Sequence, residues 1–147
     1  MSLLEYLGRA ASAWFMGFFP LFEIYLAVPA ALAMNLDVVS AVFWSVLGNF
    51  SVVPLVIFFH AQLMRLEHLR RFLAWRGSER WRRALTRYGA LFVLVMTPVL
   101  GVWAMTALAR TAGIARSTLM LASLTSITLY AVLIAAGINV GVSFLNP

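Results

Sequence analysis

Long apolar segments alternate with short polar breaks along the whole chain. Apolar residues fill positions 3–19, 21–36 and 38–59, with Pro20 at the first break and Asp37, a suitable helix N-cap, at the second. The last of these runs is long enough, at about 1.5 Å per residue, to cross a hydrocarbon core of about 30 Å, whereas the first two are too short. The pattern therefore predicts two short helices followed by one membrane span.

The same order of breaks returns in the second half of the chain. Between residues 88 and 142, an apolar run with a Pro break is followed by a long unbroken one. Shifting the sequence by 78 positions places Pro20 on Pro98 and Asn35 on Gly113. Weak internal symmetry of this kind is typical of transporters that are built from inverted repeats.

Two membrane topologies fit this pattern. In the first, four helices cross the membrane, at about 12–33, 38–59, 89–110 and 117–139. In the second, the segments around Pro20 and Pro98 enter and turn back as re-entrant hairpins, and only the two long runs cross. The positive-inside rule favours the second, because it places ten of the eleven arginines on one side of the membrane, against nine in the first.

We therefore expect an all-α polytopic membrane protein with two inverted repeats, each a re-entrant helical hairpin followed by one transmembrane helix. The chain 1–147 is then a single membrane domain, with repeat 1 over about 1–60 and repeat 2 over about 88–147. An Arg-rich amphipathic segment, 61–87, joins the repeats on the cytoplasmic side. Both termini are expected on the outer side of the membrane, opposite the Arg-rich segment.

The composition agrees with a membrane location. Hydrophobic residues make up 63% of the chain and charged residues 11%, compared with about 45–50% and about 25% in soluble domains. The chain has no Cys and two His, so we expect no disulfide, no metal site and no cofactor. No nucleophile motif, metal-ligand spacing or phosphate loop is found, and we expect that the protein is not an enzyme.

The positive charge is concentrated in one stretch. All eleven basic residues are Arg, and eight of them lie between residues 65 and 87. A basic loop between membrane segments is typical of the cytoplasmic face. Its apolar residues recur at helical spacing, which favours a helix at the interface with Arg side chains on lipid phosphates. We therefore expect the lipid bilayer as a partner and no nucleic acid.

Three groups of residues follow one another along the chain: Pro20-x-x-Glu23-x-x-x-Ala27-x-Pro29, Gly48-Asn49 with Pro54, and Pro98-x-x-Gly101-x-Trp103 followed by Leu108-Ala109. In this order they resemble the motifs of a known family, the small multidrug export proteins. They resemble its Glu-x-x-x-Ala-x-Pro motif, its Gly-Asn step in the next span and its second Pro/Gly/Trp motif. The resemblance covers nearly the whole chain.

This resemblance implies an export protein in the cytoplasmic membrane of a bacterium or archaeon. The family resembles the wider DedA-type membrane proteins, which implies two re-entrant hairpins and the movement of lipid carriers. The chain also departs from the family. Tyr25 and Leu26 stand where the family usually has Arg and Gly, and the arginines that follow the second Pro in DedA-type proteins have no counterpart here.

Glu23 is the residue that most needs a functional reason. It is the only carboxylate far from both ends of an apolar stretch, and an ionised carboxylate near the bilayer centre costs at least about 2.5 kcal/mol. In the functional interpretation, Glu23 binds a proton or a cation during transport. In the structural interpretation, it bonds to backbone N–H groups at the hairpin turn. The functional interpretation is favoured, since transporters commonly place their sites at such breaks.

Seven further positions complete the candidate substrate or ion site. For each polar member, a bond to helix backbone is somewhat favoured over a role in transport, because Ser, Thr and Asn in membrane helices often have that duty. Ser45, Ser123 and Ser126 are weaker candidates for a polar path. The seven positions are Pro20, Pro29, Asn49, Thr97, Pro98, Gly101 and Trp103.

These features favour a small transporter, coupled to protons or ions, whose partner is an amphiphilic small molecule or a lipid phosphate. The first alternative is an efflux protein for drugs and other cations. An alternative of another class is a membrane scaffold or assembly factor that transports nothing. Gly137-x-x-x-Gly141 leaves a homo-oligomer open, because such patterns can form helix dimers.

Overall fold

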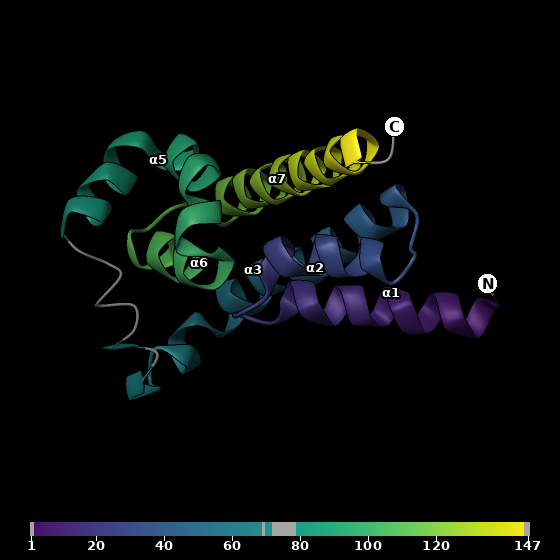
Figure 1. The fold of residues 1–147 in the computed structure, drawn as a ribbon. Coiled ribbons are helices and arrows are strands. Elements are labelled where there is room, and N and C mark those ends of the chain that lie inside the picture. Colours follow the sequence, from purple (N-terminus) through teal and green to yellow (C-terminus); the bar gives the residue numbers. More distant parts are fainter. Residues whose placement is uncertain (1, 69, 72–78, 146–147) are drawn as a thin grey trace. The chain divides into compact units, whose positions relative to one another are not determined.

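The structure, a computed structural model, describes residues 2–68, 70–71 and 79–145. This part of the chain is helical and contains no strand, which confirms the expected all-α class. The helices are drawn in Figure 1. They are α1 (Leu3–Phe18), α2 (Glu23–Ala33), α3 (Val38–Leu63), α5 (Glu79–Leu100), α6 (Val102–Thr111) and α7 (Arg116–Leu145).

The helices divide between two compact units, which are described separately below. Unit 1 contains Met1–Phe50 and Ile127–Pro147, and unit 2 contains Ser51–Ser126. Unit 1 therefore includes α1, α2, the first half of α3 and the end of α7. Unit 2 includes the second half of α3, all of α5 and α6, and the start of α7.

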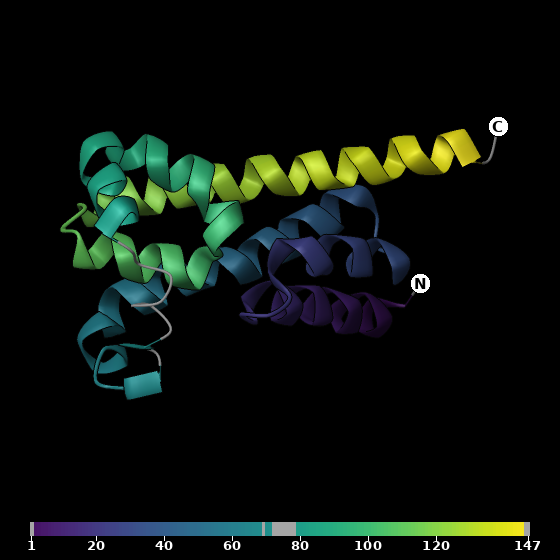
Figure 2. The same cartoon turned by 60° about the vertical axis from the view of Figure 1, so that its left-hand side comes forward.

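In unit 1, α1 and α2 form a helical hairpin and lie side by side in both views (Figures 1 and 2). A capping box starts α1: the Ser2 hydroxyl accepts from the Glu5 N–H, and the Glu5 carboxylate accepts from the Ser2 N–H. α1 ends at Phe18, and Pro20 lies in the following turn. Proline has a fixed φ and no N–H, so it favours the end of the helix at this point.

The start of α1 lies beside the start of α3. The Tyr6 hydroxyl is 3.1 Å from the Ser40 hydroxyl and accepts from Trp44 Nε1, also at 3.1 Å. Both ends of segment 3–36 therefore lie at the same end of unit 1, beside the start of α3. The continuous helix over 12–33 that four simple crossings would need is interrupted by the turn between α1 and α2.

Asp37 caps α3, as the sequence predicted. Its carboxylate accepts from the Ser40 N–H at 2.9 Å. Hydrogen bonds from the hydroxyl and the N–H of Ser40 hold the pKa of Asp37 below the ordinary value for an aspartate. The ionised side chain therefore defines the first turn of α3.

In unit 2, a second hairpin is built from the end of α5 and from α6 (Figure 2). α5 breaks at Gly89, whose φ of 49° and ψ of −120° are not helical, and only its second part is apolar. The chain turns at Gly101 (φ 83°, ψ 149°), and Pro98 lies within the last turn of α5. The turn thus lies later than its predicted place near Pro98, because these backbone angles are accessible almost only to glycine.

The end of α6 lies beside the end of α3. A His60 ring nitrogen is 3.2 Å from the Thr111 hydroxyl, and the Arg116 guanidinium lies 6.0 Å from the centre of the Phe58 ring. The end of α6 and the start of α7 therefore lie at the end of α3. A continuous helix over 89–110 is interrupted at Gly101.

Three helices are long and apolar enough to cross a membrane by length and composition: Val38–Leu63, Glu79–Leu100 and Arg116–Phe144. The second of them contains the break at Gly89. The part of α5 beyond this break would extend only about 16 Å as an α-helix, roughly half of a hydrocarbon core. With its apolar helices, the chain is an integral membrane protein.

Backbone conformations in the two halves correspond at a spacing of 78 residues. Left-handed φ angles occur at Glu23 (46°) and Gly101 (83°), and again at Asn35 (60°) and Gly113 (82°). Equivalent hydrogen bonds end the two hairpins, and α3 and α7 begin at equivalent residues. This agreement supports the 78-residue repeat, while the inverted arrangement of the halves in a membrane stays a prediction.

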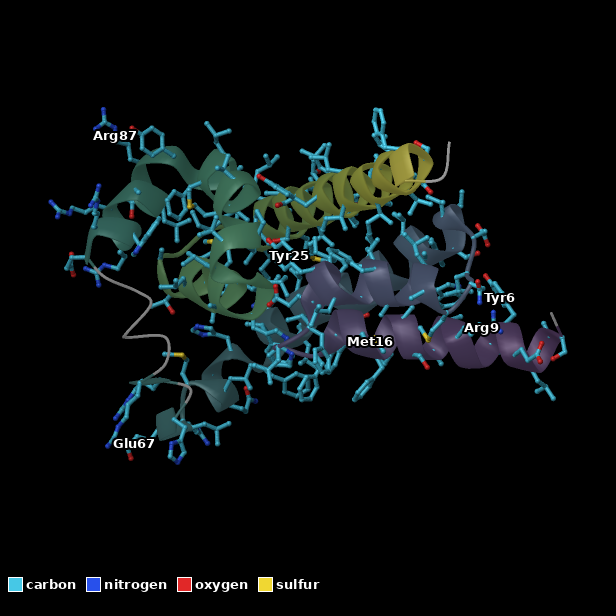
Figure 3. The ribbon with its side chains drawn as sticks, viewed as in Figure 1. Tyr6, Arg9, Met16, Tyr25, Glu67 and Arg87 are labelled. Atoms are coloured by element: carbon cyan, nitrogen blue, oxygen red, sulfur yellow. The ribbon has the colours of Figure 1, made fainter. Side chains whose placement is uncertain are left out.

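The first part of α5 is an amphipathic helix within the Arg-rich segment. Leu85 is buried, and Trp81 packs on Phe92 with ring centres 5.8 Å apart. Arg87 points away from the ribbon (Figure 3). α3 extends to Leu63, into the first residues of this segment. Residues 69 and 72–78 of the predicted Arg-rich segment lie outside the described residues.

Candidate functional site

Glu23 lies at the turn of the first hairpin and is almost fully buried, with 9% of its surface exposed. Its N–H donates to the Phe19 carbonyl at 3.2 Å, and its φ of 46° is left-handed. This conformation costs a residue with a Cβ roughly 1–2 kcal/mol. The carboxylate is at the first turn of α2, where the helix dipole favours negative charge.

Gly101 occupies the position equivalent to Glu23 in the second hairpin. Glycine adopts a left-handed φ without strain, so the turn itself does not need a carboxylate. Repeat 1 thus keeps a strained, buried acid where repeat 2 has the residue best suited to the backbone. Strained residues of this kind occur preferentially at functional sites, which supports the functional interpretation of Glu23.

Asn49 holds the tip of α1 against α3. Its Nδ2 donates to the Gly17 carbonyl at 2.9 Å, which is one of the last carbonyls of α1 and lacks a partner within the helix. The helices approach closely here because Gly48 and Gly17 have no side chains: a Cβ on Gly48 would overlap the Trp14 carbonyl oxygen. The bond from Asn49 therefore positions the end of α1, directly before the Pro20 turn.

Pro29 lies inside α2 and is partly exposed. As a proline it has no N–H to donate to the carbonyl of Tyr25, four residues earlier. Ala27 and Ala31, on either side of it, are fully buried. Pro29 thus adds a backbone irregularity one to two turns after Glu23 within the short second helix of the hairpin.

In unit 2, Thr97 and Pro98 lie near the end of α5, where the backbone hydrogen bonds of the helix are incomplete because Pro98 has no N–H. The Thr97 hydroxyl donates to the Val93 carbonyl at 2.5 Å. Pro98 has no N–H for the Leu94 carbonyl, and the Ser126 hydroxyl of α7 donates to that carbonyl instead, at 2.6 Å. Ser126 is thus a structural partner of Pro98, and the missing N–H of a membrane proline is the signal that points to such a donor.

The eight predicted positions divide equally between the two units. Pro20, Glu23, Pro29 and Asn49 belong to unit 1. Thr97, Pro98, Gly101 and Trp103 belong to unit 2, where Trp103 is a partly exposed residue of α6. In each unit, most of these residues lie at or near the turn of a hairpin.

The motifs around these turns are matched by a known protein family. The family model described as "Putative small multi-drug export protein" matches residues 23–134. The chain belongs to this family. No curated protein and no solved structure matches the chain. The match begins at Glu23 and includes every candidate position except Pro20. It confirms the resemblance to the small multi-drug export family. The relation to DedA-type proteins stays a prediction.

Among the described residues of this member of the small multi-drug export family, three hydroxyls are buried without a hydrogen-bond partner. They belong to Ser45 in unit 1 and to Thr106 and Ser123 in unit 2. Ser45 and Ser123 are equivalent at the 78-residue spacing. A buried unpaired hydroxyl costs about 1–3 kcal/mol, so these groups are further candidates for contact with a substrate, an ion or water.

An apolar groove of about 420 Å³ lies on unit 1. Residues of α1 and α3 line it, and the polar contact between Asn49 and Gly17 lies one turn further along both helices. An apolar lining suits an acyl chain and not a headgroup. The lining residues are Leu7, Ala10, Ala11, Trp14, Trp44 and Leu47.

Metal ligands do not come together among the described residues. No three His, Asp or Glu side chains lie close enough there to hold a metal ion. The arrangement offers a buried carboxylate at the turn of the first hairpin and polar side chains near the turns of both hairpins.

Proposed function

We propose that the protein is a small transporter that moves an amphiphilic molecule across the membrane, coupled to a proton or cation at Glu23. One observation carries the proposal: a buried carboxylate in a strained, left-handed conformation at the turn between α1 and α2. Membership of the small multi-drug export family supports an export function. Ion sites at helix breaks are common in transporters.

The proposal includes a membrane arrangement in which α3 and α7 cross and the two hairpins are re-entrant from opposite sides. The contact of Tyr6 with Ser40 supports it at the start of α3, and that of His60 with Thr111 supports it at the end. These two ends are about 39 Å apart along the helix. The arrangement also keeps ten of the eleven arginines on one side.

Single cysteines can test this arrangement, because the natural chain has no Cys. We expect Leu4→Cys and Ser143→Cys to react with a membrane-impermeant maleimide from outside, and Ser117→Cys to react only from the cytoplasmic side. Val39→Cys is the reference, since both topologies place it outside. If four helices cross the membrane, the other three cysteines would each be labelled from the opposite side. That result would contradict the re-entrant hairpins.

An amphiphile suits the proposal because two crossing helices are too few to enclose a wide aqueous channel. A headgroup needs only a polar notch, while its tail stays in the bilayer or in the groove beside α1. The helices α2 and α6 both begin at their hairpin turns, so their positive ends favour an anionic headgroup. We therefore favour an anionic lipid-like substrate.

A second candidate function is efflux of cationic drugs. The carboxylate of Glu23 would attract a cation directly, and the printed description of the family names multi-drug export. The two candidates differ in the charge of the substrate. They also differ in whether Glu23 is protonated or ionised when the substrate binds.

Transport by purified protein in liposomes tests both candidates. A labelled polyprenyl phosphate and, separately, a quaternary ammonium dye are offered under a pH gradient. We expect the lipid phosphate to cross faster than in liposomes without protein. Movement of the dye alone would assign the protein to cation efflux, and movement of neither would favour a scaffold.

A further inference from the structure

Two arginines lie at the end of unit 2 where α6 ends and α7 begins. Arg110 Nη1 donates to the Ile114 carbonyl at 3.1 Å, so its guanidinium lies against the loop that leads into α7. Arg116 is the first residue of α7, and its guanidinium lies over the Phe58 ring of α3. The bond between His60 and Thr111 holds the ends of α3 and α6 together at the same place.

Among the residues that the structure describes, no acidic side chain forms an ion pair with Arg110 or Arg116. The ion pairs found among the described residues are Arg71–Glu67 and Arg82–Glu79, and neither includes Arg110 or Arg116. In addition, Arg110 Nε is buried and has no hydrogen-bond partner. A buried N–H of a cation without an acceptor is costly, so an acceptor from outside the chain is expected.

The fold itself does not need these arginines. At the 78-residue spacing, the equivalent residues in repeat 1 are Leu32 and Val38. The equivalent loop has a left-handed φ at the corresponding position, Asn35 in place of Gly113, and the corresponding closing hydrogen bonds. Leu32 packs against the cluster that contains Ala31 and Leu36. The same backbone is therefore formed with apolar side chains, and the two charges are an addition specific to repeat 2.

We propose that Arg110 and Arg116, with the start of α7, bind a phosphate group. Three features select this chemistry. Guanidinium groups match the oxygens of a phosphate in a fork geometry. The first N–H groups of α7 have no carbonyl partner within the helix, and the helix dipole favours an anion there. The site lies at one end of α3, a helix long enough to cross the membrane, which is where lipid phosphates lie.

The phosphate can come from a lipid headgroup or from a soluble phosphate compound. Binding is measured by native mass spectrometry and titration of the full-length protein in a phosphate-free detergent. The probes are dioctanoyl phosphatidic acid, inorganic phosphate and, as the phosphate-free control, dioctanoylglycerol. We expect phosphatidic acid to bind and dioctanoylglycerol not to bind. Displacement by inorganic phosphate supports a soluble ligand, and its absence supports a headgroup.

Two variants copy repeat 1 and are therefore expected to fold: Arg110→Leu and Arg116→Val. Each should weaken binding of phosphatidic acid by about tenfold, because a charge-assisted contact to the phosphate is lost. Arg110→Gln is a second, polar replacement with the same expected loss. Arg9→Gln is the matched control, because Arg9 lies in α1, outside this site and outside the Arg-rich segment. The change also removes one positive charge and should leave binding nearly unchanged.

The proposal is overturned if the Arg110 variants bind phosphatidic acid as tightly as the natural protein. It is also overturned if Arg9→Gln weakens binding to the same extent, because the attraction would then be due to net charge. The site is separate from Glu23. Loss of transport in a Glu23 variant with unchanged binding of phosphatidic acid would leave this inference standing by itself.

Discussion

Replacing Glu23 by glutamine is expected to reduce transport by at least about tenfold, equivalent to about 1.4 kcal/mol in the barrier, with no loss of folded protein. Glutamine has nearly the size of glutamate and fits the same turn. It cannot exchange a proton near neutral pH or balance a cation, so any coupling cycle at this residue stops. The fold should be retained, because the change removes a charge that is costly to bury.

The same liposomes measure this change, with the pH gradient set in each direction. Glu5→Gln is the matched control, because Glu5 is an exposed carboxylate whose role in the capping box glutamine can also fill. If Glu23→Gln transports at the natural rate and keeps the natural pH dependence, the carboxylate has only a structural role.

Glu23→Gly separates backbone strain from chemistry. It places in repeat 1 the residue that repeat 2 has at the same turn, and relief of the left-handed strain should stabilise the hairpin by about 1 kcal/mol. A variant that is more stable and inactive would indicate that the strained backbone at Glu23 is retained because transport requires the carboxylate.

Replacing Gly48 by alanine is expected to destabilise the protein by about 3 kcal/mol, the upper part of the range for overpacking. The added Cβ would overlap the Trp14 carbonyl oxygen and lie within 2.9 Å of two further backbone atoms of Trp14. Backbone cannot rotate away as a flexible side chain can. α1 must therefore move from α3, and the bond between Asn49 and Gly17 should be lost with it.

Reversible unfolding in mixed detergent micelles, followed by tryptophan fluorescence, measures the effect. The control is Gly137→Ala in α7, where an added Cβ meets nothing within 4 Å. That change should leave stability equal or slightly higher, because alanine is the better helix former. A Gly48→Ala variant as stable as Gly137→Ala would show that α1 does not pack closely on α3.

Several features of the fold were readable from local sequence. Pro20 ended a helix because its ring fixes φ and it has no N–H. Asp37 capped α3 because a short carboxylate reaches the N–H three residues later. The 78-residue spacing was visible in the order of breaks, and the backbone of the two halves agrees with it. Each depends on interactions within a few residues of the chain.

The turn of the second hairpin was placed too early from sequence. Pro98 was the more visible breaker, but α5 continues past it to Leu100, since Ser126 supplies the donor that the proline lacks. The turn occurs at Gly101, where the required angles exclude other residues. That hydroxyl belongs to another helix, and no pattern near Pro98 in the sequence contains it.

The membrane class of this protein, its polar breaks and its candidate carboxylate were determined by the sequence alone, because they depend on composition and on single residues that are costly in an apolar run. Only the tertiary structure decided which positions are structural and which remain unsatisfied. Asn49 proved to hold the end of α1, while Ser45, Thr106 and the Nε of Arg110 stayed without partners. Hydrogen bonding between helices depends on which faces meet, and residues 32 or more apart meet only in the folded chain.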